Sequence, residues 1–150
     1  YGIEINDFAS VVAKTALWIA ESQMMSETSK ILQRNLDFLP LKSYANIVEG
    51  NALRIDWETV VPKDKLNYIM GNPPFVGARL MSKEQKDDGV AVFGAKWKNA
   101  GNLDYVACWY MKAVKYMAGT KIECAFVSTN SICQGEQVPA VWKLLTEKQE

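Results

Sequence analysis

Strand-like runs alternate with helical patterns along this chain. Four short runs are rich in apolar or β-branched residues: Tyr1–Ile5, Ala45–Glu49, Asn67–Met70 and Ile122–Val127. Neighbouring parallel strands need a crossover connection, which is usually a helix. The alternation therefore predicts an α/β fold with a mainly parallel sheet.

Helices are predicted after the first strand and on both sides of the last one. One begins near Asn6 or Asp7, whose side chains suit an N-cap. Another runs from a cap at Asn102 to a stop at Gly119. The final helix begins near Gln137.

Three stretches have no clear periodicity of apolar residues. Residues 25–41 are mixed, which predicts a helix tail followed by irregular structure. Ile55 to Pro62 and residues 78–101 are predicted to be loops. Long loops in compact domains are often functional, and a solvated insertion explains 78–101 equally well.

Composition limits the classes of protein that fit. The chain has 150 residues, 49% of them hydrophobic, which suits one domain with a real core. Its 17 basic and 17 acidic residues cancel, so a nucleic acid would have to be held mainly by another part of the molecule. The absence of histidine excludes Ser-His and Cys-His catalysis and most zinc sites.

The cysteines Cys108, Cys124 and Cys133 are odd in number and lack CxxC spacing. This pattern predicts reduced thiols, no metal site and a cytoplasmic location. No apolar run is long enough for a bilayer, and the first residues do not resemble a signal peptide.

Polar residues collect where the predicted strands end: Glu4, Asn51, Asn72 and Asn130. Parallel α/β sheets bind ligands at the carboxyl ends of their strands. A cap or turn explains each residue by itself. Their common location favours a binding site.

The stretch MGNPPF, residues 70–75, ends a strand abruptly. Proline fixes its own φ and keeps the preceding residue extended, so the side-chain oxygen of Asn72 and the carbonyl oxygen of Pro73 are held side by side. Together they can accept both hydrogens of one planar amino group, while Phe75 offers a stacking face. The two acceptors favour the positive charge that develops when such a nitrogen attacks. An ordinary turn is the competing interpretation.

These residues resemble the N6-adenine DNA methyltransferases, whose catalytic motif is Asn-Pro-Pro-aromatic. Tyr1–Asn6 is similar to the family motif whose acidic residue binds the ribose of S-adenosylmethionine, and Glu49–Leu53 to the next cofactor motif. Further runs resemble the large bacterial restriction-modification enzymes that fuse a nuclease to a methyltransferase: Asn102–Ala107, Ala125–Ile132 and Gln134–Gln137.

The resemblance implies two groups of site residues and no metal. The catalytic group is Asn72, Pro73, Pro74 and Phe75. The cofactor group is Glu4 at the ribose hydroxyls, Ile5 and Ala52 beside the adenine ring, and Asn51 at its polar edge. The family often has aspartate at the position of Asn51.

The resemblance also implies that residues 1–150 are part of a catalytic domain with a doubly wound sheet of the class I, Rossmann-like type. The family's first strand and glycine-rich cofactor motif should precede Tyr1, and DNA recognition should lie beyond Glu150. We therefore expect the isolated piece to be inactive and to bind S-adenosylmethionine weakly or not at all.

Three other functions fit the same residues. Similar motifs serve methylation of RNA guanine and of protein glutamine, which are also planar nitrogens. A non-catalytic α/β scaffold is the third, because the glycine-rich motif is missing from this chain.

Overall fold

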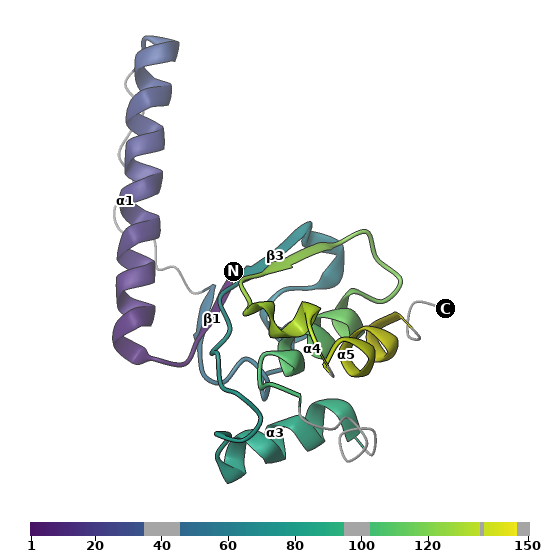
Figure 1. Cartoon of the computed structure of the whole chain (residues 1–150). Coiled ribbons are helices and arrows are strands. Elements are labelled where there is room, and N and C mark those ends of the chain that lie inside the picture. Colours follow the sequence, from purple (N-terminus) through teal and green to yellow (C-terminus); the bar gives the residue numbers. More distant parts are fainter. Residues whose placement is uncertain (35–45, 95–102, 136, 147–150) are drawn as a thin grey trace. The chain divides into compact units, whose positions relative to one another are not determined.

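The computed structural model describes residues 1–34, 46–94, 103–135 and 137–146 (Figure 1). The chain divides into two compact units, Tyr1–Ile55 and Asp56–Glu150. We call them the first unit and the second unit.

The first unit contains two short parallel strands and one long helix. Strand β1 (Gly2–Glu4) pairs with β2 (Ile47–Glu49) in parallel, and helix α1 (Asp7–Leu32) lies between them in the sequence. The backbone N–H of Gly50 donates to the carbonyl of Glu4 at 2.8 Å, so the pairing continues to the carboxyl ends of both strands. The predicted strands and their parallel direction are confirmed.

Helix α1 begins where the sequence predicts. The side chain of Asn6 accepts a hydrogen bond from the backbone N–H of Ala9 at 2.9 Å, which satisfies one of the free donors of the first turn. The helix continues to Leu32, so the predicted helix tail is confirmed, and residues 35–45 lie outside the described residues. Ser10 is its one buried residue, and large apolar side chains such as Phe8 are exposed.

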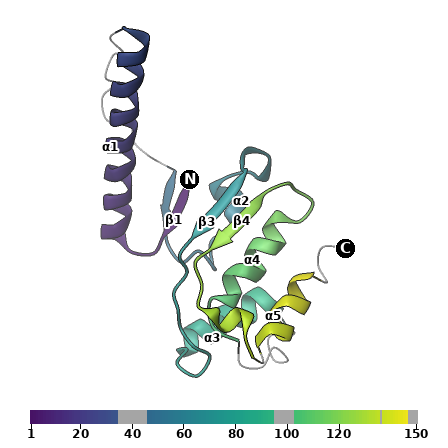
Figure 2. The ribbon, with the colours of Figure 1, turned by 45° about the horizontal axis from the view of Figure 1, so that its top comes forward.

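The second unit has two parallel strands, β3 (Tyr68–Gly71) and β4 (Glu123–Phe126), which lie side by side in Figure 2. Its helical elements are α2 (Trp57–Val60), η1 (Lys63–Lys65), α3 (Lys83–Phe93), α4 (Ala107–Met117), η3 (Asn130–Cys133) and α5 (Gln137–Thr146). The predicted strands and the start of the last helix are confirmed.

Helix α4 covers one face of the β3–β4 pair. The ring of Tyr110 from α4 meets the ring of Phe126 edge to face, with centroids 5.3 Å apart. A side chain at Gly71 would come within 3.2 Å of the Phe126 ring, so the position of that ring favours glycine there. The sequence predicts that the last strand is buried, but Glu123 and Ala125 are exposed, because alternate residues of a strand point to opposite faces.

The core of the second unit lies around α4. Leu103, Val106 and Met111 are each 1% exposed. The hydroxyl of Tyr116 donates to the carbonyl of Val61 at 2.6 Å and ties α4 to the segment after α2. The ring of Trp57 meets that of Tyr116 edge to face at 5.6 Å.

The predicted loop at 78–101 is wrong in part, because residues 83–93 form α3. A capping box starts this helix: the Ser82 hydroxyl accepts from the backbone of Gln85, whose side chain accepts from the backbone of Ser82. The buried face includes Asp88 and Gly89 beside apolar Val92, which hides the helical period from a search for apolar residues. Residues 95–102 lie outside the described residues.

Two smaller predictions are also corrected. Helix α4 begins at Ala107, later than the predicted cap, and Leu103 is buried in the irregular segment before it. The predicted loop around Trp57 contains the one-turn helix α2, whose N-cap is the side chain of Asp56. No helix among the described residues is long and apolar enough to cross a membrane.

Candidate functional site

The Asn-Pro-Pro-Phe segment follows β3 directly and combines a buried proline with exposed residues at both of its ends. Pro73 is buried, whereas Asn72 is exposed and Phe75 is 50% exposed. The carbonyl of Gly71 accepts the backbone N–H of Val127 at 3.0 Å, so the strand ladder still holds the residue just before Asn72. A buried proline next to a paired strand end fixes the backbone from which the Asn72 amide projects.

The chain after the segment is held by residues that precede α4. The backbone N–H of Tyr105 donates to the carbonyl of Val76 at 2.9 Å. The backbone N–H of Ala78 donates to Oδ1 of Asp104 at 3.1 Å. The segment is therefore anchored on both sides, by the ladder before it and by these bonds after it.

The same region holds the loop after β4. Oδ2 of Asp104 accepts a hydrogen bond from the hydroxyl of Ser131 at 2.8 Å. The backbone N–H of Asp104 donates to the side chain of Gln137 at 3.3 Å. The hydroxyl of Tyr110 lies 2.7 Å from that of Ser128. Helix α4 and the residues just before it thus hold both loops at the carboxyl ends of β3 and β4.

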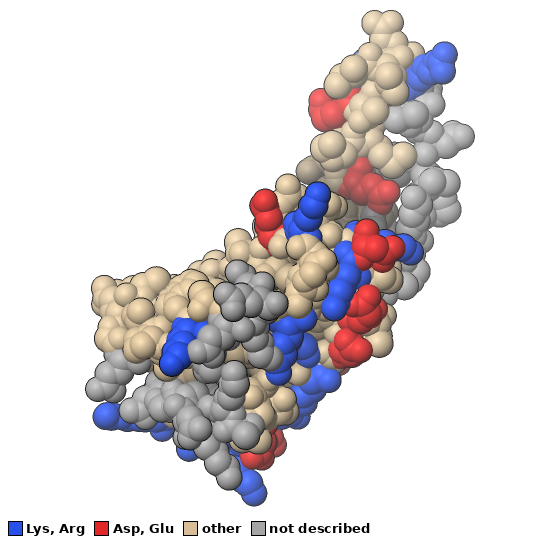
Figure 3. Space-filling model, turned by 90° about the vertical axis from the view of Figure 1, so that its right-hand side faces the viewer, with Lys and Arg blue, Asp and Glu red and all other residues tan. Residues whose placement is uncertain are grey.

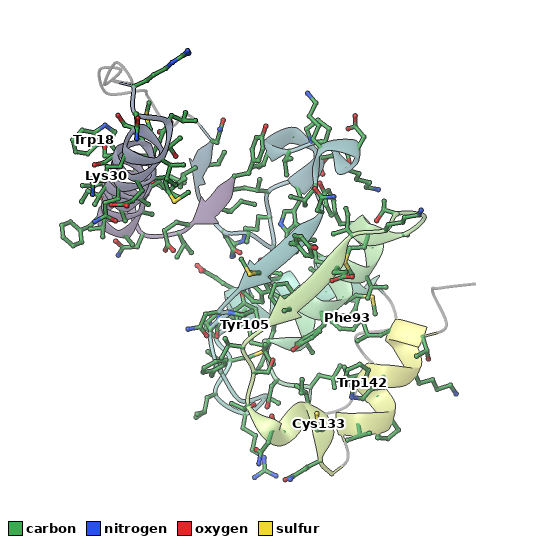
Figure 4. All side chains as sticks on the ribbon, turned by 90° about the horizontal axis from the view of Figure 1, so that it is seen from above. Trp18, Lys30, Phe93, Tyr105, Cys133 and Trp142 are labelled. Carbon is green, nitrogen blue, oxygen red and sulfur yellow. The ribbon has the colours of Figure 1, made fainter. Side chains whose placement is uncertain are left out.

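The buried carboxylate of Asp88 accepts a hydrogen bond from Tyr105, which lies among the second unit's packed elements in Figure 4. Its hydroxyl donates to Oδ2 of Asp88 at 2.7 Å, and Asp88 on α3 is 6% exposed. The Tyr105 ring also meets that of Trp109 edge to face at 5.0 Å. Sequence reasoning gave no role to these residues, although the run Asn102–Ala107 carries part of the family resemblance.

Glu4 is the last residue of β1 in the first unit, and Ile5 follows it. Oε1 of Glu4 accepts the backbone N–H of Asn6 at 3.0 Å, and the side chain is partly exposed. Ile5 is 68% exposed, which is unusual for a large apolar side chain beside a strand end.

Asn51 and Ala52 follow β2. The side-chain oxygen of Asn51 accepts the backbone N–H of Leu53 at 2.9 Å and so shapes the turn after the strand. Both Asn51 and Ala52 are partly exposed. A side chain at Gly50, whose φ is +146°, would lie 2.8 Å from Ile55, so this turn needs glycine.

The structure brings the predicted residues together in two groups. Glu4 is the last residue of β1, and Asn51 comes two residues after the end of the paired strand β2. Asn72 follows β3, and Asn130 lies in η3 after the paired strand β4. Each group combines exposed or partly exposed polar side chains with a backbone that local hydrogen bonds hold in place.

Two of the three thiols of the second unit, those of Cys108 and Cys124, do not supply a nucleophile. Burial, with a smaller effect of the Asp88 charge, raises the pKa of Cys108 to about 12. Burial raises the pKa of Cys124 to about 11. Both thiols are therefore protonated at neutral pH, and thiols react as nucleophiles through the thiolate.

Charge gives no single-sign surface on the face shown in Figure 3, where basic and acidic side chains lie beside one another. This matches the net charge of zero for the whole chain. Among the described residues, no three His, Cys, Asp or Glu side chains are grouped as metal ligands would be.

Comparison with known proteins gives concordant matches. Residues 1–150 match the family described as MmeI, DNA-methyltransferase domain. The chain is 44% identical over 148 residues to DNA methyltransferase A of Bacillus subtilis (strain 168), covering 97% of this chain and 17% of that protein. It is 46% identical to the solved structure of the Type IIL restriction-modification enzyme MmeI in complex with DNA, with a TM-score of 0.89 over 98% of this chain and 20% of that one. The chain thus spans about a fifth or less of these relatives.

Proposed function

The chain belongs to the MmeI DNA-methyltransferase domain family, and from this premise we propose that it is part of an enzyme that methylates the N6 amino group of adenine in DNA, within a restriction-modification protein. The observation that carries the proposal is the Asn-Pro-Pro-Phe segment directly after a parallel strand, with Pro73 buried and Asn72 exposed. An exposed amide on a fixed backbone can accept hydrogen bonds from a substrate amino group.

The polar residues of the first unit fit S-adenosylmethionine, which supplies the methyl group when bound. Glu4 uses one oxygen for the backbone of Asn6, and its carboxylate has further lone pairs that can accept from both ribose hydroxyls. The amide of Asn51 can meet the polar edge of an adenine ring. The exposed side chain of Ile5 and the small side chain of Ala52 offer apolar contact to its faces.

Asn72 and Pro73 carry the proposed chemistry. Their oxygens accept the two hydrogens of the adenine amino group, whose lone pair is delocalised into the ring. With S-adenosylmethionine bound, these acceptors would favour the positive charge that develops on nitrogen during methyl transfer. The bond between the methyl carbon and the sulfonium sulfur would break and leave a neutral thioether, and the nitrogen would lose its proton to solvent. Because hydrogen-bond acceptors provide the stabilisation, the step needs no histidine, and the chain has none.

Phe75 holds the target base. An adenine must leave the duplex to reach Asn72, which costs a few kcal/mol of lost stacking and pairing. The Phe75 ring, 50% exposed, offers a face on which the extruded base can stack. Pro74 lies between Asn72 and Phe75 and restricts the backbone there, because proline fixes its own φ. It therefore limits where the Phe75 ring can lie relative to Asn72.

The proposal also accounts for the two short sheets. Each parallel pair has only two strands among the described residues, and such pairs are marginal by themselves. Strands from outside residues 1–150 would complete a doubly wound, mainly parallel sheet of the class I type. In this proposal residues 1–150 are one part of the catalytic domain, and recognition of the DNA sequence belongs to another part of the protein.

The test uses a full-length protein that carries this sequence. Asn72→Ala removes one acceptor and should slow methyl transfer about a hundredfold to a thousandfold, by analogy with the loss of an oxyanion-hole donor. Asn72→Asp retains an acceptor oxygen and should keep more activity than the alanine variant. Single-turnover formation of N6-methyladenine, measured by mass spectrometry, compares the two. A normal rate for Asn72→Ala would refute the proposed role of this residue.

Phe75→Ala separates base capture from chemistry. It should weaken binding of DNA with an extruded target base by about 1–3 kcal/mol, the range for base stacking on aromatic side chains. Binding of S-adenosylmethionine, measured by calorimetry, should be unchanged. Unaltered affinity for such DNA would exclude Phe75 as the stacking residue.

A further inference from the structure

We propose that Asp104 is a positioning residue for the reacting amide, because its carboxylate joins the loop after Asn-Pro-Pro-Phe to the loop after β4. Oδ1 accepts the backbone N–H of Ala78, and Oδ2 accepts the hydroxyl of Ser131. The inference rests on the proposed function and adds a residue to the same site.

The two loops need such a connection because the strand ladder ends just before them. The last paired residues are Gly71 and Phe126, and the N–H of Val127 makes the final bond to Gly71. Beyond this point no ladder bond holds the loops together. Asp104 spans the two loops with one side chain, and hydrogen bonds to a charged acceptor are stronger than neutral ones.

Asn72 lies between two fixed points. The ladder holds Gly71 on one side, and on the other the N–H of Tyr105 holds Val76 while Asp104 holds Ala78. The prolines between these points restrict the remaining backbone freedom. Loss of the bond between Asp104 and Ala78 should therefore shift the Asn72 amide. A displacement of about 1 Å can cost about a hundredfold in rate.

The anchor is itself held in place. The neighbouring residue Tyr105 donates its hydroxyl to the buried carboxylate of Asp88 on α3. The backbone N–H of Asp104 donates to the side chain of Gln137 at the start of α5. Asp104 thus connects the packed helices α3 and α5 to the loop that carries the exposed reacting group.

The substitutions separate positioning from general stability. Asp104→Ala removes both side-chain bonds. Asp104→Asn can keep both, because its oxygen accepts from Ala78 and its NH₂ donates to the hydroxyl oxygen of Ser131. Ser131→Ala removes only one of the two Asp104 bonds, together with the 2.6 Å hydrogen bond between the Ser131 and Thr129 hydroxyls, and serves if Asp104→Ala does not fold. Asp64→Ala is the matched control, since Asp64 is an exposed aspartate of the same unit, in η1.

The measurement is the single-turnover rate of adenine methylation in a full-length protein carrying this sequence, with the Kd of S-adenosylmethionine from calorimetry. Asp104→Ala should lower the rate about tenfold to a hundredfold and leave the Kd within about twofold. Asp104→Asn and Asp64→Ala should stay within about threefold of the parent rate. Ser131→Ala should fall between the two Asp104 variants.

A double variant tests whether Asp104 acts through Asn72. If it does, Asp104→Ala should add little to the loss already caused by Asn72→Ala. A full multiplicative loss, a normal rate in Asp104→Ala, or an Asp104→Asn variant as slow as Asp104→Ala would each overturn the inference.

The two proposals fail in different ways. A normal rate in Asn72→Ala would refute the proposed function. A slow Asn72→Ala variant beside a normal Asp104→Ala variant would leave that function standing and refute the positioning role alone.

Discussion

The two units end their parallel strands in similar ways but are stabilised differently. In the first unit, α1 has 26 residues, of which Ser10 is the buried one, and large apolar side chains such as Ile31 at 79% exposure face solvent. In the second unit, the 11-residue helix α4 buries residues such as Cys108 and Met111 against its neighbours. The segment that we propose to be catalytic therefore belongs to the unit with the larger core of its own.

This difference indicates how each unit can position its candidate site residues. The second unit fixes the chain around Asn72 through packed helices and side-chain bonds such as that of Asp104. The first unit fixes Glu4 and Asn51 by bonds to backbone groups two residues further along. We expect the second unit to be rigid enough for chemistry, and the first to depend on local turns and on further contacts for its stability.

The largest expected effect is on the core. Leu103→Ala should lower the free energy of unfolding by about 2–5 kcal/mol, because Leu103 is 1% exposed and its truncation leaves a cavity. Leu17→Ala on α1 is the matched control, since Leu17 is 47% exposed, and its cost should be within about 0.5 kcal/mol. Urea unfolding of the 150-residue chain, followed by circular dichroism, measures both. Equal losses would remove the contrast between the units.

A smaller effect should come from the turn of the first unit. Gly50→Ala should destabilise that unit by about 1–3 kcal/mol, because the added carbon would lie 2.8 Å from Ile55 at a φ of +146°. Gly2→Ala is the control, since its added carbon would lie 3.6 Å from Ile47, an ordinary contact. Hydrogen exchange of the β1 and β2 amides reports the difference. Identical protection in the two variants would show that the turn tolerates a side chain.

The smallest expected effect concerns DNA. Lys83 is the exposed first residue of α3, and Lys83→Gln in a full-length protein should weaken DNA binding and lower the salt slope by about one. The helix should persist, because a cation is unfavourable in the first turn. Lys14→Gln on α1 should leave the slope unchanged. A slope that falls only with Lys14 would place the DNA contact in the first unit.

Much of the fold could be predicted from the sequence because the strands are short apolar runs and their helices carry ordinary caps. Asn6 marked the start of α1, and Gln137 that of α5. Helix α3 was missed because Asp88 and Gly89 belong to its buried face. The capping box of Ser82 and Gln85 was the available signal.

The location of a candidate site residue could be predicted only where the residue lies close to the end of its own strand. Asn72 follows β3 directly, and its constraint by Pro73 can be read from the sequence. The bonds of Asp104 join it to Ala78 and Ser131, which lie 26 and 27 residues away. Such contacts depend on the packing of α4 and α5, which periodicity does not specify.

The central claim is that the two units divide the work, with cofactor binding in the first and chemistry in the second. The most direct measurement compares Glu4→Gln with Asn72→Ala in a full-length protein carrying this sequence, using calorimetry for the Kd of S-adenosylmethionine and single turnover for the methylation rate. Glu4→Gln should raise the Kd about tenfold to a hundredfold, as expected for a hydrogen bond to a charged group, with the rate at saturating cofactor within about threefold. Asn72→Ala should do the reverse, a rate loss of about a hundredfold or more with the Kd within about twofold. If both variants changed the same quantity, the division of work between the units would be contradicted.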